Sequence, residues 1–89
     1  MARFDASIVE TVEFAPGGGT PDGLFQLGLM HCVGREVPLD LVSAHMWFNL
    51  AAARGNAEAK RYRMEIAGEM SKSEIAEAQR QAREWLRRH

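Results

Sequence analysis

This 89-residue sequence has a single cysteine, almost no net charge and no long apolar run. The single cysteine, Cys32, excludes a disulfide within the chain and favours a reducing compartment, so we expect a cytoplasmic protein. A formal net charge of −1 gives no overall attraction to nucleic acid or to a membrane surface. No apolar run reaches the ~18 residues that a membrane-spanning helix needs, and none follows a basic start as in a signal peptide.

The charge that is present is distributed unevenly along the chain. Residues 1–22 carry one arginine against four carboxylates, a net −3, whereas the remainder carries ten basic and eight acidic side chains, a net +2. That excess is too small to predict a nucleic-acid-binding face by itself. With 46% hydrophobic and 26% charged residues, the composition is that of an ordinary globular chain, and the length favours one domain.

Residues 1–20 form a leader whose structure the sequence leaves open. Its side chains Phe4, Ile8, Val12 and Phe14 are more apolar than a free tail needs, and either a short strand or helical turns fit them. The glycines at 17–19 predict a flexible hinge. Two alternatives therefore remain: a disordered leader, or a segment that packs on the helices or on a second chain.

The next part of the chain predicts two helices. Thr20 can cap the first helix, Pro21 suits its first position, and Gly34 can end it in a left-handed conformation. Asp40 can cap the second helix, which Gly55 closes. Because a connection of about six residues joins the two helices, we expect them to pack antiparallel.

The second helix is apolar on two sides, which predicts that it lies between neighbouring helices. One face carries Leu41, Ala44, Phe48, Ala51 and Ala52, and a second line carries Met46, Leu50 and Ala53. Alanines allow a neighbouring helix to approach, so we expect Trp47 to be enclosed on two flanks. Gly28 costs ~1 kcal/mol inside the first helix compared with alanine, which predicts close contact between the first two helices.

Two further helices are predicted after Gly55. Asn56 can cap the third helix, whose buried stripe is Ala59, Tyr62, Ile66 and Met70. Ser71 and Glu74 form a capping box at the start of the fourth helix, and Met70 with Ile75 forms a hydrophobic staple. The inner stripe of the fourth helix consists of Ile75, Ala78, Ala82, Trp85 and Leu86.

Residues 21–56 carry a set of small, aromatic and acidic residues at the spacing of a known repeat. These positions are Leu27, Gly28, Gly34, Val37, Asp40, Ala44, Trp47, Ala51, Ala52 and Gly55. The segment resembles a Sel1-like repeat, a relative of the tetratricopeptide repeat with a helix–turn–helix unit of about 36 residues. It departs from the family pattern at Gly23, His31 and Glu36, where alanine, an aromatic residue and glycine are usual.

The resemblance implies an all-α fold, a short α-solenoid of two antiparallel helix pairs after a flexible or partly ordered N-terminal segment. The helical domain would span residues 21–89, with the repeat at 21–56. In the second pair, 57–88, Arg63 and Met64 replace the Leu-Gly of the pattern. A degenerate pair of this kind is typical of a terminal capping unit.

No catalytic constellation is found, so we expect neither an enzyme nor a cofactor. His31, Cys32 and His45 are the only soft metal ligands besides His89. Adjacent side chains diverge by ~100° on a helix, so packed histidines are favoured over a metal site. Cys32 lies in an apolar stripe, without the electropositive setting that a cysteine nucleophile needs.

The resemblance implies a protein-interaction module, in which the first helices of successive units line a surface that binds an unidentified protein or peptide. On that basis the partner-facing residues are Phe25, Leu29, Cys32, Arg61 and Met64. The alternative is a small structural protein that only self-associates, and a homodimer is expected because one clear repeat buries little apolar surface. A weaker third interpretation is nucleic-acid binding through Lys60, Arg61, Arg63, Arg80, Arg83, Arg87 and Arg88.

Overall fold

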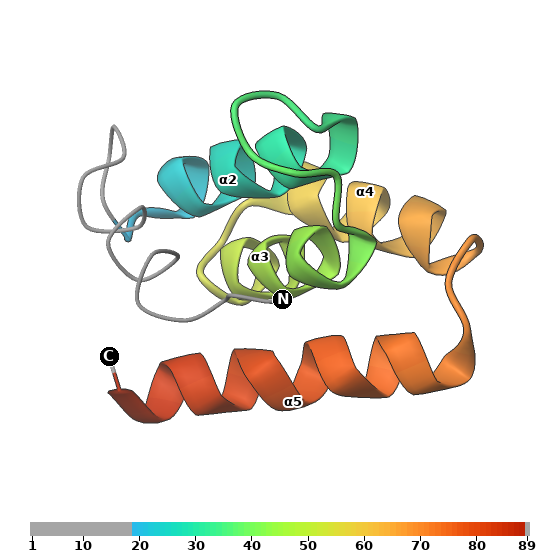
Figure 1. The fold of residues 1–89 in the computed structure, drawn as a ribbon. Coiled ribbons are helices and arrows are strands. Elements are labelled where there is room, and N and C mark those ends of the chain that lie inside the picture. The colour runs from blue at the N-terminus through green and yellow to red at the C-terminus, as the bar shows by residue number, and fades with distance from the viewer. Residues whose placement is uncertain (1–18, 89) are drawn as a thin grey trace.

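The computed structural model describes residues 19–88, and within this range the chain forms four helices (Figure 1). They are α2 (Pro21–Val33), α3 (Leu41–Ala53), α4 (Ala57–Ala67) and α5 (Lys72–Arg88). The all-α prediction is therefore confirmed for this part of the chain, and none of these helices has the length and apolarity needed to cross a bilayer. The predictions for residues 1–18 and for His89 lie outside the described residues.

The first three helices begin at their predicted caps. The side-chain oxygens of Thr20, Asp40 and Asn56 each accept the backbone N–H three residues later, at 3.1, 3.2 and 2.9 Å. Gly34 ends α2 in the left-handed conformation with a φ of 74°, and its N–H donates to the carbonyl of Met30. These contacts satisfy backbone groups that a helix terminus leaves unpaired, so short-range sequence sets the helix boundaries here.

The start of α5 carries the predicted capping box. The backbone N–H of Ser71 donates to Glu74 Oε1 at 2.8 Å, and the N–H of Glu74 donates to Ser71 Oγ at 3.1 Å. Each side chain satisfies a backbone donor of the other residue, which is the reciprocal arrangement that defines this motif. The chain can therefore reverse after α4 and begin a new helix within a few residues.

The connections on either side of α3 use backbone conformations that glycine favours. α3 ends at Ala53, two residues before the predicted closing glycine, and Gly55 has a φ of 113°. Before α3, Glu36 has a φ of 69°, in the left-handed region that costs most residues free energy. Glu36 is the position where the repeat pattern has glycine, so this turn keeps a glycine-like backbone with a glutamate in it.

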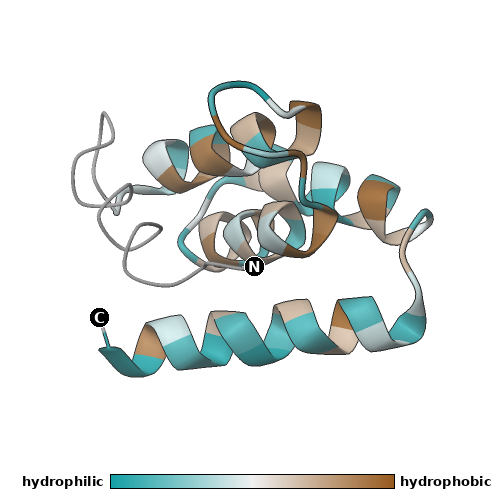
Figure 2. Cartoon of the chain, viewed as in Figure 1, coloured by the Kyte–Doolittle hydropathy of each residue, from teal (hydrophilic) through white to brown (hydrophobic). Residues whose placement is uncertain are grey.

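α3 lies at the centre of the domain and packs against α2, α4 and α5 (Figure 1). Trp47 and Phe48 are fully buried, and Met46 and Leu50 on the second apolar line are buried as well. Ala53, predicted on that second line, is exposed because it is the last residue of the helix. Figure 2 shows α5 as largely hydrophilic, with few apolar residues. The prediction of a central helix enclosed by its neighbours is confirmed.

α2 and α3 run in opposite directions and pack closely, as their short connection predicted (Figure 1). The buried Gly28 of α2 lies directly against the ring of Phe48, where a Cβ atom would overlap the ring. The predicted reason for a glycine inside this helix is therefore confirmed. The close approach of the two backbones also buries Leu24 and Leu27 completely or nearly so.

The second pair of helices departs from the predicted arrangement. α4 and α5 run in opposite directions, but α5 packs mainly on α3 rather than on α4 (Figure 1). The ring of Trp85 meets that of Trp47 edge-on, with ring centroids 6.1 Å apart, and Ala78 and Ala82 are buried on the same side of α5. Leu86, predicted on this inner stripe, is instead 49% exposed, because it follows Trp85 directly and is turned ~100° from it. The result is a compact four-helix domain.

Candidate functional site

The residues predicted to face a partner lie on α2 and α4. Phe25, Leu29 and Cys32 of α2 are half-buried and pack against the core. Arg61 and Met64 of α4 are exposed, and Met64 is 63% accessible. The α4 residues therefore offer the accessible part of the predicted surface, whereas the α2 residues mostly support it.

Tyr62 of α4, assigned from the sequence only to a buried stripe, joins the two halves of this surface. Its ring centroid lies 5.3 Å from that of Phe25 and 5.6 Å from that of Phe48. The guanidinium carbon of Arg61 lies 5.1 Å from the centre of the Tyr62 ring, within the range of a cation–π contact. Phe25 and Arg61 thus contact the same aromatic ring. The three rings of Phe25, Phe48 and Tyr62 form an aromatic cluster that packs α4 against α2 and α3.

Cys32 lies in surroundings that disfavour its thiolate. Burial is the main cause that raises the pKa of this thiol, and the carboxylates of Glu69 and Glu65 raise it further. The thiol therefore stays protonated near neutral pH, which is the opposite of what a nucleophilic cysteine needs.

His31 and His45 are both buried, and burial lowers the pKa of each imidazole. The charge of Asp40 and the backbone carbonyl of Pro38, in the connection that leads to α3, partly oppose the lowering of the pKa of His31. Among residues 19–88, no group of three or more His, Cys, Asp or Glu side chains is placed to hold a metal ion. The two imidazoles are thus part of the packing around α3.

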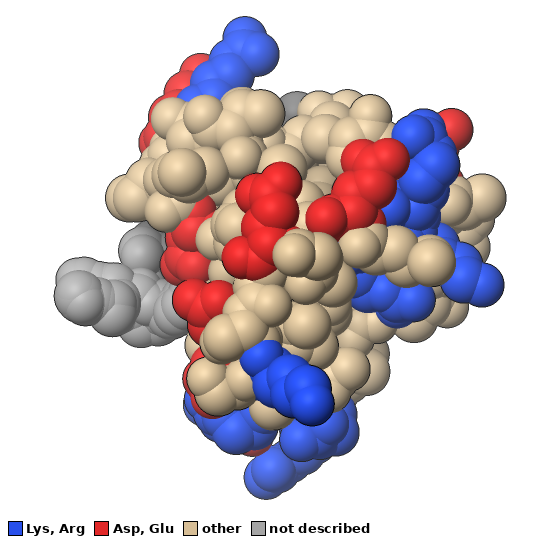
Figure 3. All heavy atoms as spheres, turned by 90° about the vertical axis from the view of Figure 1, so that its right-hand side faces the viewer, with Lys and Arg blue, Asp and Glu red and all other residues tan. Residues whose placement is uncertain are grey.

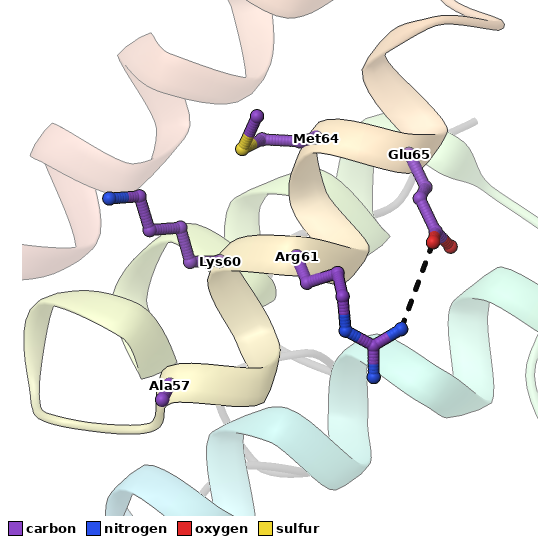
Figure 4. A pocket seen from close by; sticks show the side chains of 5 residues that line it. All are labelled: Ala57, Lys60, Arg61, Met64 and Glu65. Atoms are coloured by element: carbon purple, nitrogen blue, oxygen red, sulfur yellow. Dashed lines mark ion pairs between the residues drawn. The ribbon is translucent and has the colours of Figure 1, made fainter.

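An open pocket of about 410 Å³, with a mostly apolar lining, lies on the outer face of α4 (Figure 4). Its lining residues are Ala57, Lys60, Arg61, Met64 and Glu65. They recur at helical spacing on one face, away from the buried Ala59 and Ile66. Sequence reasoning selected Arg61 and Met64 for this surface but missed the other three, which the same helical spacing would have identified.

The charges around this pocket are only partly balanced. Arg61 is paired with Glu58 and, at 3.8 Å, with Glu65, and the hydrogen bond and charge of Glu58 raise the pKa of Arg61. Lys60 makes no ion pair within residues 19–88. In Figure 4, Lys60 and Met64 extend to one side of α4, whereas Arg61 and Glu65 extend to the other. The pocket therefore combines an uncompensated ammonium group with an exposed thioether.

Four of the seven basic residues considered for nucleic-acid binding are paired with carboxylates: Arg61, Arg80, Arg87 and Arg88. On α5, Arg80 pairs with Glu77 at 2.6 Å, and Arg87 pairs with Glu84 at 3.2 Å. On the face that Figure 3 views, acidic and basic groups are interspersed with uncharged surface. Ion pairs within the domain therefore neutralise part of the positive charge that contact with a phosphate backbone would use, and nucleic-acid binding stays the weakest of the three predictions.

Comparison of the chain with protein-family models, with curated proteins and with solved structures found no match. The resemblance of residues 21–56 to a Sel1-like repeat therefore depends on the residue pattern alone.

Proposed function

We propose that this domain is a protein-interaction module that binds a peptide, or an extended segment of a partner protein, on the outer face of α4. The observation that carries the proposal is the open, mostly apolar pocket beside Lys60 and Met64. Methionine adapts its shape to apolar groups of different form, which suits a binding surface. Lys60 can pair with a carboxylate of the ligand. The best ligand is therefore a segment in which a large apolar side chain neighbours an acidic residue.

We further propose that α2 and α3 form one Sel1-like unit and that α4 begins a degenerate second unit of a short α-solenoid. The contact of Gly28 with Phe48 and the left-handed conformation of Gly34 support the first unit. In such an array the first helices of successive units, here α2 and α4, share the binding surface. The ring contact between Phe25 and Tyr62 supports that arrangement, because it holds the two helices side by side.

The proposal is tested by selecting ligands for the full chain from a random peptide library displayed on phage. Selected peptides should contain an apolar residue beside Asp or Glu, and their dissociation constants are measured by fluorescence anisotropy. Met64→Glu places a carboxylate in the pocket, which removes apolar contact and repels the acidic ligand. We expect it to weaken binding at least about tenfold, which is ~1.4 kcal/mol.

Leu39→Glu is the matched control, because Leu39 is 65% exposed, close to the 63% of Met64, but lies in the connection before α3. This variant should bind the selected peptides as the unchanged chain does. The proposal is wrong if the library yields no specific binder. It is also wrong if the two variants weaken binding equally, or if Met64→Glu has no effect.

Self-association is the alternative function, and a second apolar surface favours it. Val33 and Leu39, each 65% exposed, flank the turn that joins α2 to α3. A homodimer formed through this surface would cover both side chains. Light scattering after gel filtration at low micromolar concentration should then give twice the mass of one chain, and Val33→Glu with Leu39→Glu should give the monomer. A monomeric unchanged chain would exclude this alternative.

A further inference from the structure

The described chain begins at a fixed point beside the C-terminal half of α5. Arg54, which follows α3, donates a hydrogen bond from Nη1 to the carbonyl oxygen of Gly19 at 3.0 Å. The guanidinium carbon of the same arginine lies 5.2 Å from the centre of the Trp85 ring. One side chain thus connects the first described residue to α5, and the segment that precedes Gly19 must start from this place.

The surface of α5 next to this point carries an excess of positive charge and an exposed apolar group. Arg87 and Arg88 both pair with the single carboxylate of Glu84, at 3.2 and 3.6 Å. Arg83 makes no ion pair within residues 19–88. Leu86 lies among these arginines in the sequence and is 49% exposed. A segment that is both acidic and apolar would complement this surface.

Residues 1–18 have that composition. They contain one arginine against three carboxylates, a net −2, and their apolar side chains include Ile8, Val12 and Phe14. Within residues 1–18, Glu13 is the acidic residue and Phe14 the aromatic residue nearest to Gly19. Five peptide units separate Phe14 from Gly19 and span at most about 17 Å, so Phe14 stays within reach of the last turns of α5.

We infer that residues 1–18 bind to the C-terminal half of α5 of their own chain, with Phe14 and Val12 against Leu86 and with Glu13 and Glu10 near Arg83 and Arg87. Covalent attachment beside the site gives the segment a high effective concentration, so weak contacts suffice to hold it. This occupant leaves the pocket on α4 free. The inference therefore stands apart from the peptide binding proposed above.

The test measures hydrogen exchange of the full chain by mass spectrometry at low micromolar concentration. Amides of residues 4–14 should exchange at least about tenfold more slowly than the rates of an unstructured peptide. Arg83→Glu with Arg87→Glu should remove this protection, because both cations are reversed. Arg35→Glu with Lys72→Glu is the matched control, since both residues are exposed and lie outside the last two turns of α5. This control should keep the protection.

A charge swap then separates direct contact from a general loss of folding. Glu10→Lys with Glu13→Lys should remove the protection by itself, and should restore it in the chain that carries Arg83→Glu with Arg87→Glu. Circular dichroism establishes that each variant keeps its helices. The inference is overturned if residues 4–14 exchange at unprotected rates in the unchanged chain. It is also overturned if the swap fails to restore protection, or if protection depends on protein concentration, which would indicate a second copy of the chain as the acceptor.

Discussion

Gly28 of α2 and the ring of Phe48 on α3 are so close that a Cβ atom at Gly28 would lie 2.4 Å from two carbons of that ring. Glycine costs ~1 kcal/mol in a helix interior compared with alanine, and here the close approach of two backbones offsets that cost. Phe48 also contacts the rings of Phe25 and Tyr62, at 5.7 and 5.6 Å between centroids. One glycine therefore sets both the α2–α3 packing and the position of the aromatic cluster that supports α4.

Gly28→Ala should destabilise the domain. The added methyl group forces the Phe48 ring out of its place, and overpacking of this kind costs roughly 1–3 kcal/mol, more than the ~1 kcal/mol gained in helix propensity. We expect a net loss of about 1 kcal/mol, seen as a lower urea midpoint by circular dichroism. Gly68→Ala is the control, because Gly68 has helical angles and its Cβ would meet only the carbonyl of Glu65 at 3.4 Å. Equal stability of the two variants would contradict this account.

Glu36→Gly should stabilise the domain. Glu36 has a φ of 69°, and a residue with a side chain pays about 1–2 kcal/mol for that conformation, against roughly 0.5–1 kcal/mol of added chain entropy for glycine. A net gain of about 0.5–1 kcal/mol should raise the urea midpoint. The reciprocal change, Gly34→Ala at a φ of 74°, should lower it. A lower midpoint for Glu36→Gly would show that its side chain, rather than its backbone, decides the stability of this turn.

Local signals in the sequence were sufficient to predict the helices, because each cap bonds to a residue only three positions away. Thr20, Asp40 and Asn56 all act as predicted. The position of α5 was not predictable in this way, since its contact with α3 joins Trp47 to Trp85 across a long stretch of sequence. The resemblance to a repeat family instead predicted that α5 pairs with α4.

The candidate site also has a part that the sequence predicted and a part that it did not. Arg61 and Met64 were identified from the expected arrangement of repeat helices, and both are exposed on α4. The pocket that Lys60 also lines exists because no other helix in the described part of the chain covers the outer face of α4. The spacing of apolar residues along the chain does not indicate which helix faces stay uncovered. Likewise, the positive φ of Glu36 could not be predicted from the residue type, because it is the turn around Glu36 that requires this conformation.

Acidification should destabilise the domain through its two buried histidines. Burial lowers the pKa of His31 and His45 below the ordinary value of 6.5, and the charge of Arg63 lowers that of His45 further, whereas Asp40 and the Pro38 carbonyl partly oppose the shift at His31. The unfolded chain therefore takes up protons at a higher pH than the folded chain does. Stability is complete above about pH 6.5 and falls as the pH drops below it, by at most about 1.4 kcal/mol per pH unit for each histidine.

Urea unfolding at pH 7.5, 6.5 and 5.5 measures this dependence. His45→Gln removes one titrating group and should make stability less dependent on pH in that range. Glu77, whose pKa is lowered to about 2 mainly by its hydrogen bond with Arg80, protonates in the unfolded chain only near pH 4.5 and does not contribute there. A urea midpoint that is the same at all three values would show that neither imidazole is kept neutral by the fold.

Trp85→Ala should release α5 from α3. Trp85 is 7% exposed and packs edge-on against Trp47, and removal of such a side chain costs about 3–5 kcal/mol, comparable with the whole stability expected of a core this small. The emission of Trp47, then the only tryptophan, should shift to longer wavelength as water reaches it. Trp85→Phe keeps an aromatic edge and most of the buried area, so it should lose only about 1–2 kcal/mol and keep Trp47 emission at short wavelength. If Trp85→Ala left that emission unchanged, α5 would not be what encloses the central tryptophan.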